Sequence, residues 1–471
     1  MQPPNRPVES LDVLPKRVIV HSGFVFSGHL DVPRLRGAAA KVVEVYPELN
    51  VSIKGDWFTL GEWRTPASKG PALDFKHREL PDKTLADAFG PAAAAAKMDL
   101  DASSKVTSLG IANIPDAQGL FGFDGPSVGS LGLSPIPTLS FRVKTLGSPD
   151  DGHTLLAMII PHFITDAMGL GGLMETWGRL YRGEAVPTRT ENPHPDLLKI
   201  LDAMPAVDST APIKEDEQPG SGLRAGFLDF FSYGKDMARL ASSKEFEERY
   251  VHFPSRLLEK YRDEARTRLG SDVPGPSVSR HDVFSAMMLR LYANSSFVSD
   301  ETQPFDFYNV YSMLPVFPKG SLPTPYLHNI NTPGWFPLSS SSFILSTSLP
   351  ELATIIRRRL NALRTVDNVR EVILYNERMG SALGQVPRVD ARHGWGMVSS
   401  WGGVEDMASA GFAGEKLVFL RPATQNLGEM AAPNIAYSFR DGHGGIISRI
   451  VLIKGDWDAM WAGSGLDGLE V

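Results

Sequence analysis

The sequence predicts an α/β or α+β protein built in two halves, and three observations support this fold class. The chain has 471 residues, which at roughly 150 residues per domain is too long for one ordinary core. Apolar residues make up 42% of the chain and charged residues 21%, a balance typical of globular proteins. Strand-like and helix-like segments alternate on both sides of a polar stretch. We therefore expect an N-terminal domain at 1–185, a linker at 186–222 and a C-terminal domain at 223–471.

Charge and cysteine content exclude several classes of function. The formal net charge is -7, whereas a general nucleic-acid binder needs a basic surplus. The chain has no cysteine, which excludes disulfides, a thiolate nucleophile, cysteine-ligated zinc and iron–sulfur clusters. The first residues lack the apolar stretch of a signal peptide, and no apolar run reaches the roughly 18 residues that span a membrane. We expect a cytosolic protein without a bound metal.

The first half of the chain alternates strands with amphipathic helices. Residues 32–45 carry apolar side chains at helical spacing. Residues 154–160 form a continuous apolar run, which is the pattern of a strand buried in a sheet. The helix that follows this strand is expected to stop at Gly183. Its apolar stripe is Leu170, Leu173, Trp177 and Leu180. Further strands are expected at 18–20, 24–26 and 138–144.

The second half shows the same mixture of elements. Residues 250–253 read as a strand, and Ser255 is expected to cap the helix that follows. Ser279 and Asp282 stand three residues apart, as in a capping box, and open another helix. A third amphipathic helix is expected from about 351 to 363. Further strands are expected at 396–401, 416–420 and 446–452.

The run His162-Phe163-Ile164-Thr165-Asp166 is the candidate catalytic motif. It lies in a turn between a buried strand and an amphipathic helix, where a side chain reaches a cleft while the scaffold stays rigid. A neutral imidazole is well suited to accept a proton near pH 7. A carboxylate one turn later can fix the loop through backbone N–H groups or a basic partner. The glycines that follow remove side chains where a ligand or a neighbouring segment comes close.

The same two residues also fit a structural role or a metal site. A histidine and an aspartate four residues apart occur by chance in many chains, so His162 is equally a candidate for a hydrogen-bonded core histidine. The two residues are also candidate metal ligands, although no other histidine or carboxylate lies near them in sequence.

The residues around the motif resemble the BAHD acyltransferase family, and more closely its fungal branch that includes trichothecene acetyltransferases. That family carries a His-x-x-x-Asp-Gly signature, and Asp-Ala-x-Gly, as at 166–169 here, is a frequent fungal form. The other matching landmarks keep the family's order along residues 15–465. They are Tyr46-Pro47-Glu48-Leu49, Val251-His252-Phe253, Ser279-x-x-Asp282-x-Phe284-x-Ala286, Tyr326-Leu327-His328-Asn329, Val398-Ser399-Ser400-Trp401 and Asp441-Gly442-His443-Gly444-Gly445.

The resemblance implies a fold and a mechanism. It implies two chloramphenicol-acetyltransferase-like domains, each a mixed sheet with flanking helices, with an active-site tunnel between them and a segment near 397–422 packed with the first. His162 would deprotonate the acceptor, which attacks the thioester of acyl-CoA, expected to be acetyl-CoA, without a covalent enzyme intermediate. Ser399 and Trp401 match positions that donate hydrogen bonds to the oxyanion. Alternatively, Trp401 is a core residue and Ser399 pairs with backbone.

The resemblance also implies partners. The catalytic set is His162, Asp166, Ser399 and Trp401, and Ser279 and Gly169 are expected on the cofactor side. The partners are a small-molecule acceptor and acyl-CoA, with no resident cofactor, no metal, no nucleic acid and no membrane. We expect a monomer.

Two departures from the family pattern matter. The second signature, Asp-Phe-Gly-Trp-Gly, is represented by 410–416, in which Phe412 and Gly414 are kept but the aspartate is missing. The strand at 307–312 carries Tyr311 where the family often has an arginine that pairs with the aspartate of the first signature. Asp166 then needs another partner, and the Tyr311 hydroxyl is a candidate.

These observations leave three functional hypotheses. The first is an acyl-CoA-dependent O-acyltransferase acting on a hydroxyl of a small secondary metabolite. The second is an enzyme of the same fold that uses His162 for a CoA-independent cyclisation, elimination or rearrangement of a natural product. The third is a ligand-binding protein without turnover. A serine hydrolase is disfavoured, because the Gly-x-Ser-x-Gly run at 125–129 is followed by a segment that cannot start a regular helix.

Overall fold

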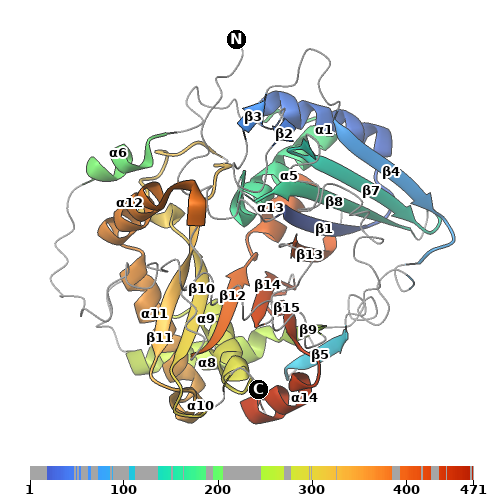
Figure 1. Cartoon of the computed structure of the whole chain (residues 1–471). Coiled ribbons are helices and arrows are strands. Elements are labelled where there is room, and N and C mark those ends of the chain that lie inside the picture. Colours follow the sequence, from blue (N-terminus) through green and yellow to red (C-terminus); the bar gives the residue numbers. More distant parts are fainter. Residues whose placement is uncertain are drawn as a thin grey trace.

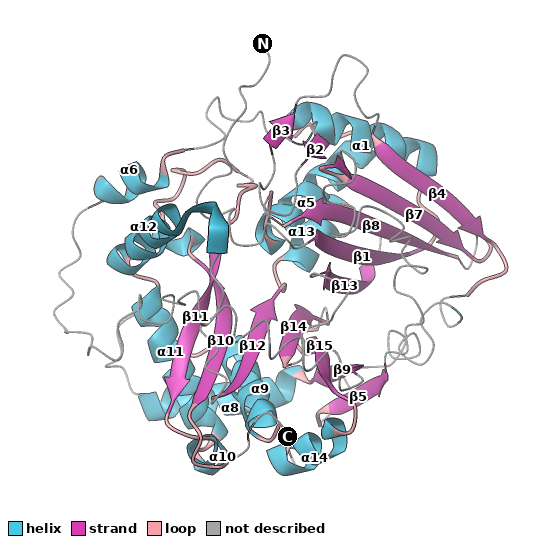
Figure 2. Cartoon of the chain, viewed as in Figure 1, coloured by secondary structure: helices cyan, strands magenta, loops and turns pink. Residues whose placement is uncertain are grey.

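The computed structural model contains two large mixed sheets with flanking helices (Figures 1 and 2), so the predicted α/β class is confirmed. Short strands β2 (Ser52–Lys54), β3 (Glu62–Arg64) and β6 (Ile136–Pro137) form a third, small sheet. The structure describes residues 19–46, 49, 52–54, 62–64, 73–84, 87, 105–111, 136–149, 152–162, 164–186, 195–204, 246–269, 277–295, 298, 300–324, 326–383, 393–414, 417–425, 434–441, 443–466 and 469. The rival run at 125–129 lies outside them.

The N-terminal sheet has five strands in the order β13-β1-β8-β7-β4. β1 pairs antiparallel with both β13 and β8, β7 pairs antiparallel with β8, and β4 runs parallel to β7. Helix α5 packs against both α1 and α13. The strand bounds are β1 Ile19–Ser27, β4 Asp74–Leu80, β7 Ser140–Leu146, β8 His153–Pro161 and β13 Leu417–Gln425. The helix bounds are α1 Val32–Val45, α5 Ala167–Arg182 and α13 Val404–Gly411.

The C-terminal sheet has seven strands in the order β11-β10-β12-β14-β15-β9-β5. β10, β12 and β14 run parallel, and the other pairs are antiparallel. The strand bounds are β5 Thr107–Ile111, β9 Phe246–Phe253, β10 Phe305–Ser312, β11 Asn331–Leu338, β12 Gly394–Ser400, β14 Ile435–Arg440 and β15 Ile446–Ile453. The helices are α8 Ser255–Leu269, α9 Arg280–Ala293, α10 Ser341–Ser346, α11 Leu349–Leu363, α12 Val366–Leu383 and α14 Asp456–Ser464, with a 3-10 turn at Leu314–Val316.

The two halves exchange strands. β13 comes from the last part of the chain but pairs with β1 of the N-terminal sheet, and α13 just before it packs on α5. In the other direction, β5 lies early in the chain but pairs with β9 of the C-terminal sheet. In the described part of the predicted linker lies a short helix, α6 (Leu197–Asp202), whose Asp202 pairs with Arg370 of α12 at 3.0 Å. The exchange makes each sheet depend on residues from both halves of the sequence.

Helix α5 is fixed by capping and by aromatic packing. The Asp166 side chain caps its first turn, and Gly183 ends it in the left-handed conformation, at φ 79°. Trp177 is fully buried, and its indole N–H donates to the Leu35 carbonyl at 3.0 Å. Replacing a buried tryptophan by alanine typically costs about 3–5 kcal/mol, so this helix is a rigid support for the loop that precedes it.

Most predicted elements occur within a few residues of their expected bounds. One difference is that the two strands expected at 18–20 and 24–26 are a single strand, β1. The polar residues between them, including Ser22, do not interrupt it, because β1 pairs with β8 along its whole length. A second is that α8 begins at Ser255 itself rather than after it. Among the described residues, no helix is both long and apolar enough to cross a membrane.

Candidate active site

The candidate catalytic loop joins the end of β8 to the start of α5 (Figure 1). His162 follows the last residue of β8 and is half-buried, whereas Asp166, at the N-cap of α5, is 1% exposed. β8 is the central strand of its sheet and all but its first residue are buried. The local sequence therefore places a half-buried histidine and a buried carboxylate in the same turn.

The Asp166 carboxylate is bound by backbone N–H groups. Its Oδ1 accepts from Met168 N at 2.9 Å and from Gly169 N at 3.0 Å, and its Oδ2 accepts from Ile330 N at 3.0 Å. Burial raises the pKa of Asp166, while these three hydrogen bonds and the nearby His162 oppose that rise. The first two bonds form the helix cap, and the third ties the loop to the segment before β11. Asp166 therefore acts as a brace.

The predicted Tyr311 partner of Asp166 is wrong. The Tyr311 hydroxyl donates to the Leu363 carbonyl at 3.4 Å and accepts from Asn368 Nδ2 at 3.2 Å. It therefore lies in the core between β10 and the end of α11, and burial raises the pKa of Tyr311. A backbone N–H at Ile330 supplies the contact with Asp166 from the C-terminal half.

His162 is bound by a side chain from the C-terminal half. Its Nδ1 lies 3.0 Å from Asn329 Oδ1, and Asn329 Nδ2 donates to the His162 main-chain carbonyl at 2.7 Å. Asn329 is 2% exposed. Asn329 and Ile330 are adjacent, so one short segment holds both members of the motif.

Gly169 permits the approach of that segment. A Cβ at this position would stand 2.8 Å from the Leu327 carbonyl oxygen and would also clash with the Thr165 hydroxyl. Leu327 is 1% exposed and belongs to the core of the N-terminal half. Gly169 was expected on the cofactor side. In this structure, its lack of a side chain allows the backbone of Leu327 to pack against α5.

Ser399 and Trp401 lie at the end of β12 in different surroundings. Ser399 is half-buried and stands in register with Val310 of β10 and Tyr437 of β14. Trp401 is 3% exposed, and its side chain is part of the same hydrophobic cluster as Leu327. Its backbone N–H donates to the Ser438 carbonyl at 2.7 Å. Ser399 is thus the more accessible of the two candidate oxyanion donors.

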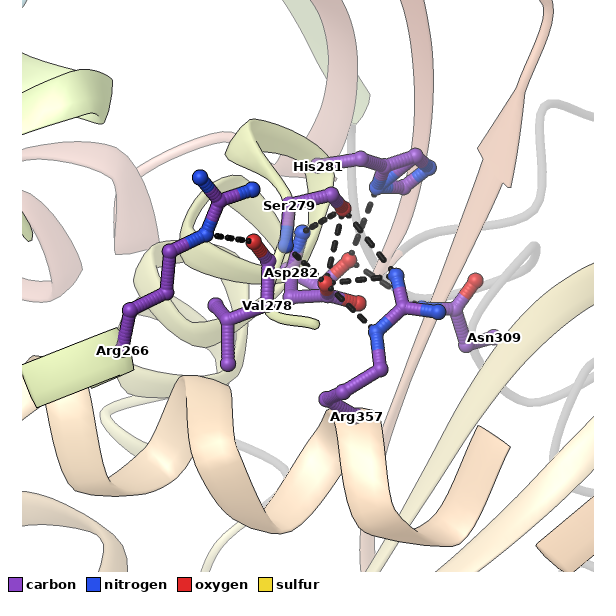
Figure 3. Close-up of polar contacts among 8 residues, drawn as sticks. Arg266, Val278, Ser279, His281, Asp282, Asn309 and Arg357 are labelled. Atoms are coloured by element: carbon purple, nitrogen blue, oxygen red, sulfur yellow. Dashed lines mark hydrogen bonds and ion pairs between the residues drawn. The ribbon is translucent and has the colours of Figure 1, made fainter. Parts of the chain in front are cut away.

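Ser279 caps α9, as the sequence predicted, within a buried polar network (Figure 3). Its hydroxyl donates to Asp282 Oδ2 at 2.7 Å, and that same carboxylate oxygen pairs with Arg357 at 2.6 Å. In the next turn, Ser285 Oγ lies 3.1 Å from His281 Nδ1 and accepts from Asn309 Nδ2 at 3.1 Å. Burial lowers the pKa of His281. The Ser279 side chain, expected on the cofactor side, therefore serves the helix cap.

Phe412, which this chain keeps from the second signature, packs in the core of the N-terminal half. Phe412 is fully buried, with its ring centroid 5.0 Å from that of Phe26 and 5.8 Å from that of Trp177. Gly178 of α5 and Gly411 of α13 contact each other through backbone, so the two helices cross closely. This packing fixes α13, which begins three residues after Trp401.

Sequence reasoning missed Asn329 and Ile330 as site residues. Asn329 is the last residue of the Tyr326-Leu327-His328-Asn329 landmark, but nothing near it in sequence signals its contact with a histidine 167 positions away. The Ile330 contribution is a backbone N–H, which has no side-chain signature.

Comparisons with known proteins agree with this description. No family model matches the chain. Acetyltransferase peniE of Penicillium patulum is 24% identical over 501 residues, covering 96% of this chain and 95% of the relative. Acetyltransferase pyiB of Pyricularia grisea is 27% identical over 218 residues, covering 44% and 40%. F. graminearum TRI101 in complex with coenzyme A and T-2 mycotoxin has a TM-score of 0.68 at 14% identity, covering 97% and 96%. Vinorine synthase has a TM-score of 0.59 at 14% identity, covering 97% and 92%.

These similarities test two predictions, the fold and the resemblance to fungal acetyltransferases. The solved structures share the two-sheet architecture along nearly the whole chain, and both curated relatives are fungal acetyltransferases. The chain therefore has the two-domain fold of BAHD acyltransferases, a family of acyl-transferring enzymes, and its predicted resemblance to their fungal acetyltransferase branch is confirmed.

Proposed function

We propose that this chain is an acyl-CoA-dependent O-acyltransferase that modifies a hydroxyl of a small secondary metabolite, with acetyl-CoA as donor. The observation that carries the proposal is the half-buried His162, oriented by two hydrogen bonds with Asn329 on a rigid turn. The full-length similarity to acetyltransferase peniE and the shared fold with TRI101, which was solved with coenzyme A, support the same reaction. A monomer in the cytosol, with the reaction in a tunnel between the domains, completes the proposal.

The proposed reaction proceeds by direct transfer. His162 Nε2 takes the proton of the acceptor hydroxyl while the hydroxyl oxygen bonds to the thioester carbonyl carbon. The tetrahedral intermediate then collapses, the carbon–sulfur bond breaks, and the CoA thiolate recovers the proton from the imidazolium. General base catalysis of this kind contributes roughly 10²–10⁴-fold to rate. No covalent enzyme intermediate is needed, which suits a chain without cysteine.

The oxyanion of the intermediate needs hydrogen-bond donors. We assign Ser399 as the first donor because it is half-buried and lies one residue from the carboxyl end of β12. Trp401 is a second candidate. Removal of one such donor typically costs about 10²–10³ in turnover. Asp166 contributes by bracing the loop, and Ser279 and Gly169 stay candidates for the cofactor side.

Binding and turnover with acetyl-CoA test this function. Calorimetry with CoA and acetyl-CoA should detect binding to the whole chain. Release of CoA thiol, read with a thiol reagent, should depend on a hydroxylated acceptor. Since the chain has no cysteine, the reagent reports CoA alone. A panel of fungal alcohols that includes T-2 mycotoxin and deoxynivalenol, with mass spectrometry of the products, identifies the acceptor.

The outcomes separate the competing functions. Acceptor-dependent thiol release with an acetylated product supports the proposal, and intact mass without an acetyl adduct supports direct transfer. Absence of CoA binding together with conversion of a metabolite contradicts it and favours a CoA-independent cyclase or isomerase. Binding of a metabolite with no conversion in the presence of acetyl-CoA favours a ligand-binding protein.

A further inference from the structure

The carboxylate of the sequence motif does not orient the motif histidine. Its hydrogen bonds in the described part of the chain come from backbone N–H groups of Met168, Gly169 and Ile330. Each hydrogen bond requires the oxygen to face the backbone of α5 or of the segment before β11. Among the described residues, Asp166 interacts with His162 through its charge. Another group therefore decides which imidazole nitrogen carries the proton.

Asn329 decides it, because its two hydrogen bonds with His162 can be arranged in one way. The His162 main-chain carbonyl only accepts hydrogen bonds, so the Asn329 atom 2.7 Å from it must be the amide nitrogen. The other amide atom is then the carbonyl oxygen, which also only accepts. The His162 Nδ1 that lies 3.0 Å from this oxygen must carry hydrogen. In the neutral imidazole the lone pair is consequently on Nε2.

We propose that Asn329 is the positioning residue that holds His162 in its Nδ1–H tautomer and presents Nε2 as the base. This inference rests on the proposed function for its catalytic consequence. Asn329 fills the place that a carboxylate occupies beside the histidine of serine hydrolases. An amide selects the tautomer without bringing a negative charge next to the ring. Asn329 thereby orients His162 through a neutral group, whereas a carboxylate at the same place would also raise the basicity of the ring.

Residues 327–330 link the orientation of His162 to the contact between the two halves of the molecule. Leu327 is packed in the core of the N-terminal half, Asn329 bonds His162, and Ile330 bonds Asp166. The segment leads directly into β11, an edge strand of the C-terminal sheet. The orientation of the base therefore depends on the docking of the two halves.

Variants of Asn329 test the assignment. Asn329→Ala removes the acceptor of Nδ1–H, and we expect kcat to fall about 10–100-fold with the KM for acetyl-CoA within about threefold of the unmodified chain. Asn329→Asp keeps an acceptor but adds a charge that stabilises the imidazolium, so the acidic limb of the pH–rate profile should move upward by about one pH unit or more. Asp166 is the charged group that already acts on His162 in the unmodified chain.

Asn434→Asp is the matched control, because Asn434 is also buried and donates to a main-chain carbonyl, that of Trp395, at 3.0 Å. It should leave the acidic limb in place.

A spectroscopic measurement separates this inference from the function itself. In ¹⁵N-histidine-labelled protein, the His162 resonances, identified by their loss in His162→Gln, should show hydrogen on Nδ1 in the unmodified chain and a mixture of tautomers in Asn329→Ala. This readout needs no turnover, so it stands even if acetyl-CoA proves not to be the donor. Hydrogen on Nε2 in the unmodified chain overturns the proposal, as does an Asn329→Asp profile with an unshifted acidic limb.

Discussion

Two histidine–aspartate pairs in this chain differ in their sequence separation and in how their side chains are hydrogen-bonded. His162 and Asp166 are four residues apart, yet the structure gives each a different hydrogen-bond partner: Asn329 for the histidine and backbone N–H groups for the aspartate. His252 and Asp441 are 189 residues apart, yet His252 Nε2 lies 2.8 Å from Asp441 Oδ2. The second pair is the one with the direct hydrogen bond expected of a catalytic dyad.

Burial shows which pair is able to act on a ligand. The His252 and Asp441 side chains are 0% and 2% exposed, and the second Asp441 oxygen accepts from the backbone of His443 and Gly445. Burial opposes ionisation of Asp441, but the bonds from His252, His443 and Gly445 outweigh it and lower its pKa. This pair joins β9 to the turn after β14. The direct bond between His252 and Asp441 therefore marks a structural pair, and the half-buried His162, which is bonded to Asn329, is the candidate base.

The largest effect expected from this comparison concerns stability. His252→Ala leaves a buried carboxylate without its partner, which typically costs about 3–5 kcal/mol. The midpoint of thermal unfolding should fall by about 5–10 °C. His393→Ala is the control, because His393 Nδ1 lies at a similar distance from Asp306, 2.9 Å, but the histidine is 28% exposed. Asp306 is also buried, but water can take the place of the partly exposed His393 imidazole, so the loss should be clearly smaller. Equal losses in the two variants would contradict a structural role for the His252–Asp441 pair.

The next effect is a pH dependence of stability that arises at Glu405, in the helix that follows the strand carrying Ser399. Glu405, in the first turn of α13, accepts from Arg440 N at 2.9 Å, and burial raises its pKa to about 8. Its folded pKa lies above its unfolded value, so stability should be lost as the pH rises toward and through about 8. The loss is on the order of 2–4 kcal/mol.

Glu405→Gln isolates this titration. The variant keeps an acceptor for Arg440 N and does not ionise. We expect its melting temperature to fall less than that of the unmodified chain between pH 6 and pH 9, with calorimetric melting as the measurement. Parallel pH profiles for the two proteins would show that Glu405 is already ionised at pH 6.

A smaller effect on stability should distinguish alanine substitutions at two helical glycines, Gly169 and Gly37. Gly169→Ala places a methyl group against the Leu327 carbonyl and the Thr165 hydroxyl, which should cost about 1–2 kcal/mol. It should also lower turnover, because it displaces the segment that orients His162. Gly37→Ala is the matched control in α1, where a Cβ meets nothing within 4 Å. That change should stabilise the chain by roughly 0.5–1 kcal/mol. Stabilisation by both substitutions would contradict the close docking of residues 327–330.

The sequence allowed the scaffold of the site to be predicted because its signals are local. The apolar run of β8, the turn that carries His162 and Asp166, and the helix stop at Gly183 lie within about 30 residues, and each has a physical meaning on its own. The capping box at Ser279 was equally readable. These features position the candidate base without reference to the rest of the chain.

The groups that orient the site were not predictable in the same way. Asn329 meets His162 across 167 positions, and β5 joins the C-terminal sheet from the N-terminal part of the chain. Tyr311 was the wrong partner for Asp166 because it was inferred from the position of an arginine in the family, whereas the Asp166 carboxylate accepts from the backbone of Met168, Gly169 and Ile330. Backbone N–H groups carry out that role, and every residue except proline has one.

The central claim is that His162, and not the directly bonded His252, is the base. The most direct test is turnover per folded molecule of His162→Ala and His252→Ala, with acetyl-CoA and the acceptor identified by the product screen. We predict a loss of about 10²–10⁴-fold in kcat for His162→Ala with an unchanged melting temperature. His252→Ala should lose stability and keep kcat within a few-fold in the folded fraction. Full activity in His162→Ala, or a larger loss of kcat in His252→Ala, would contradict the account.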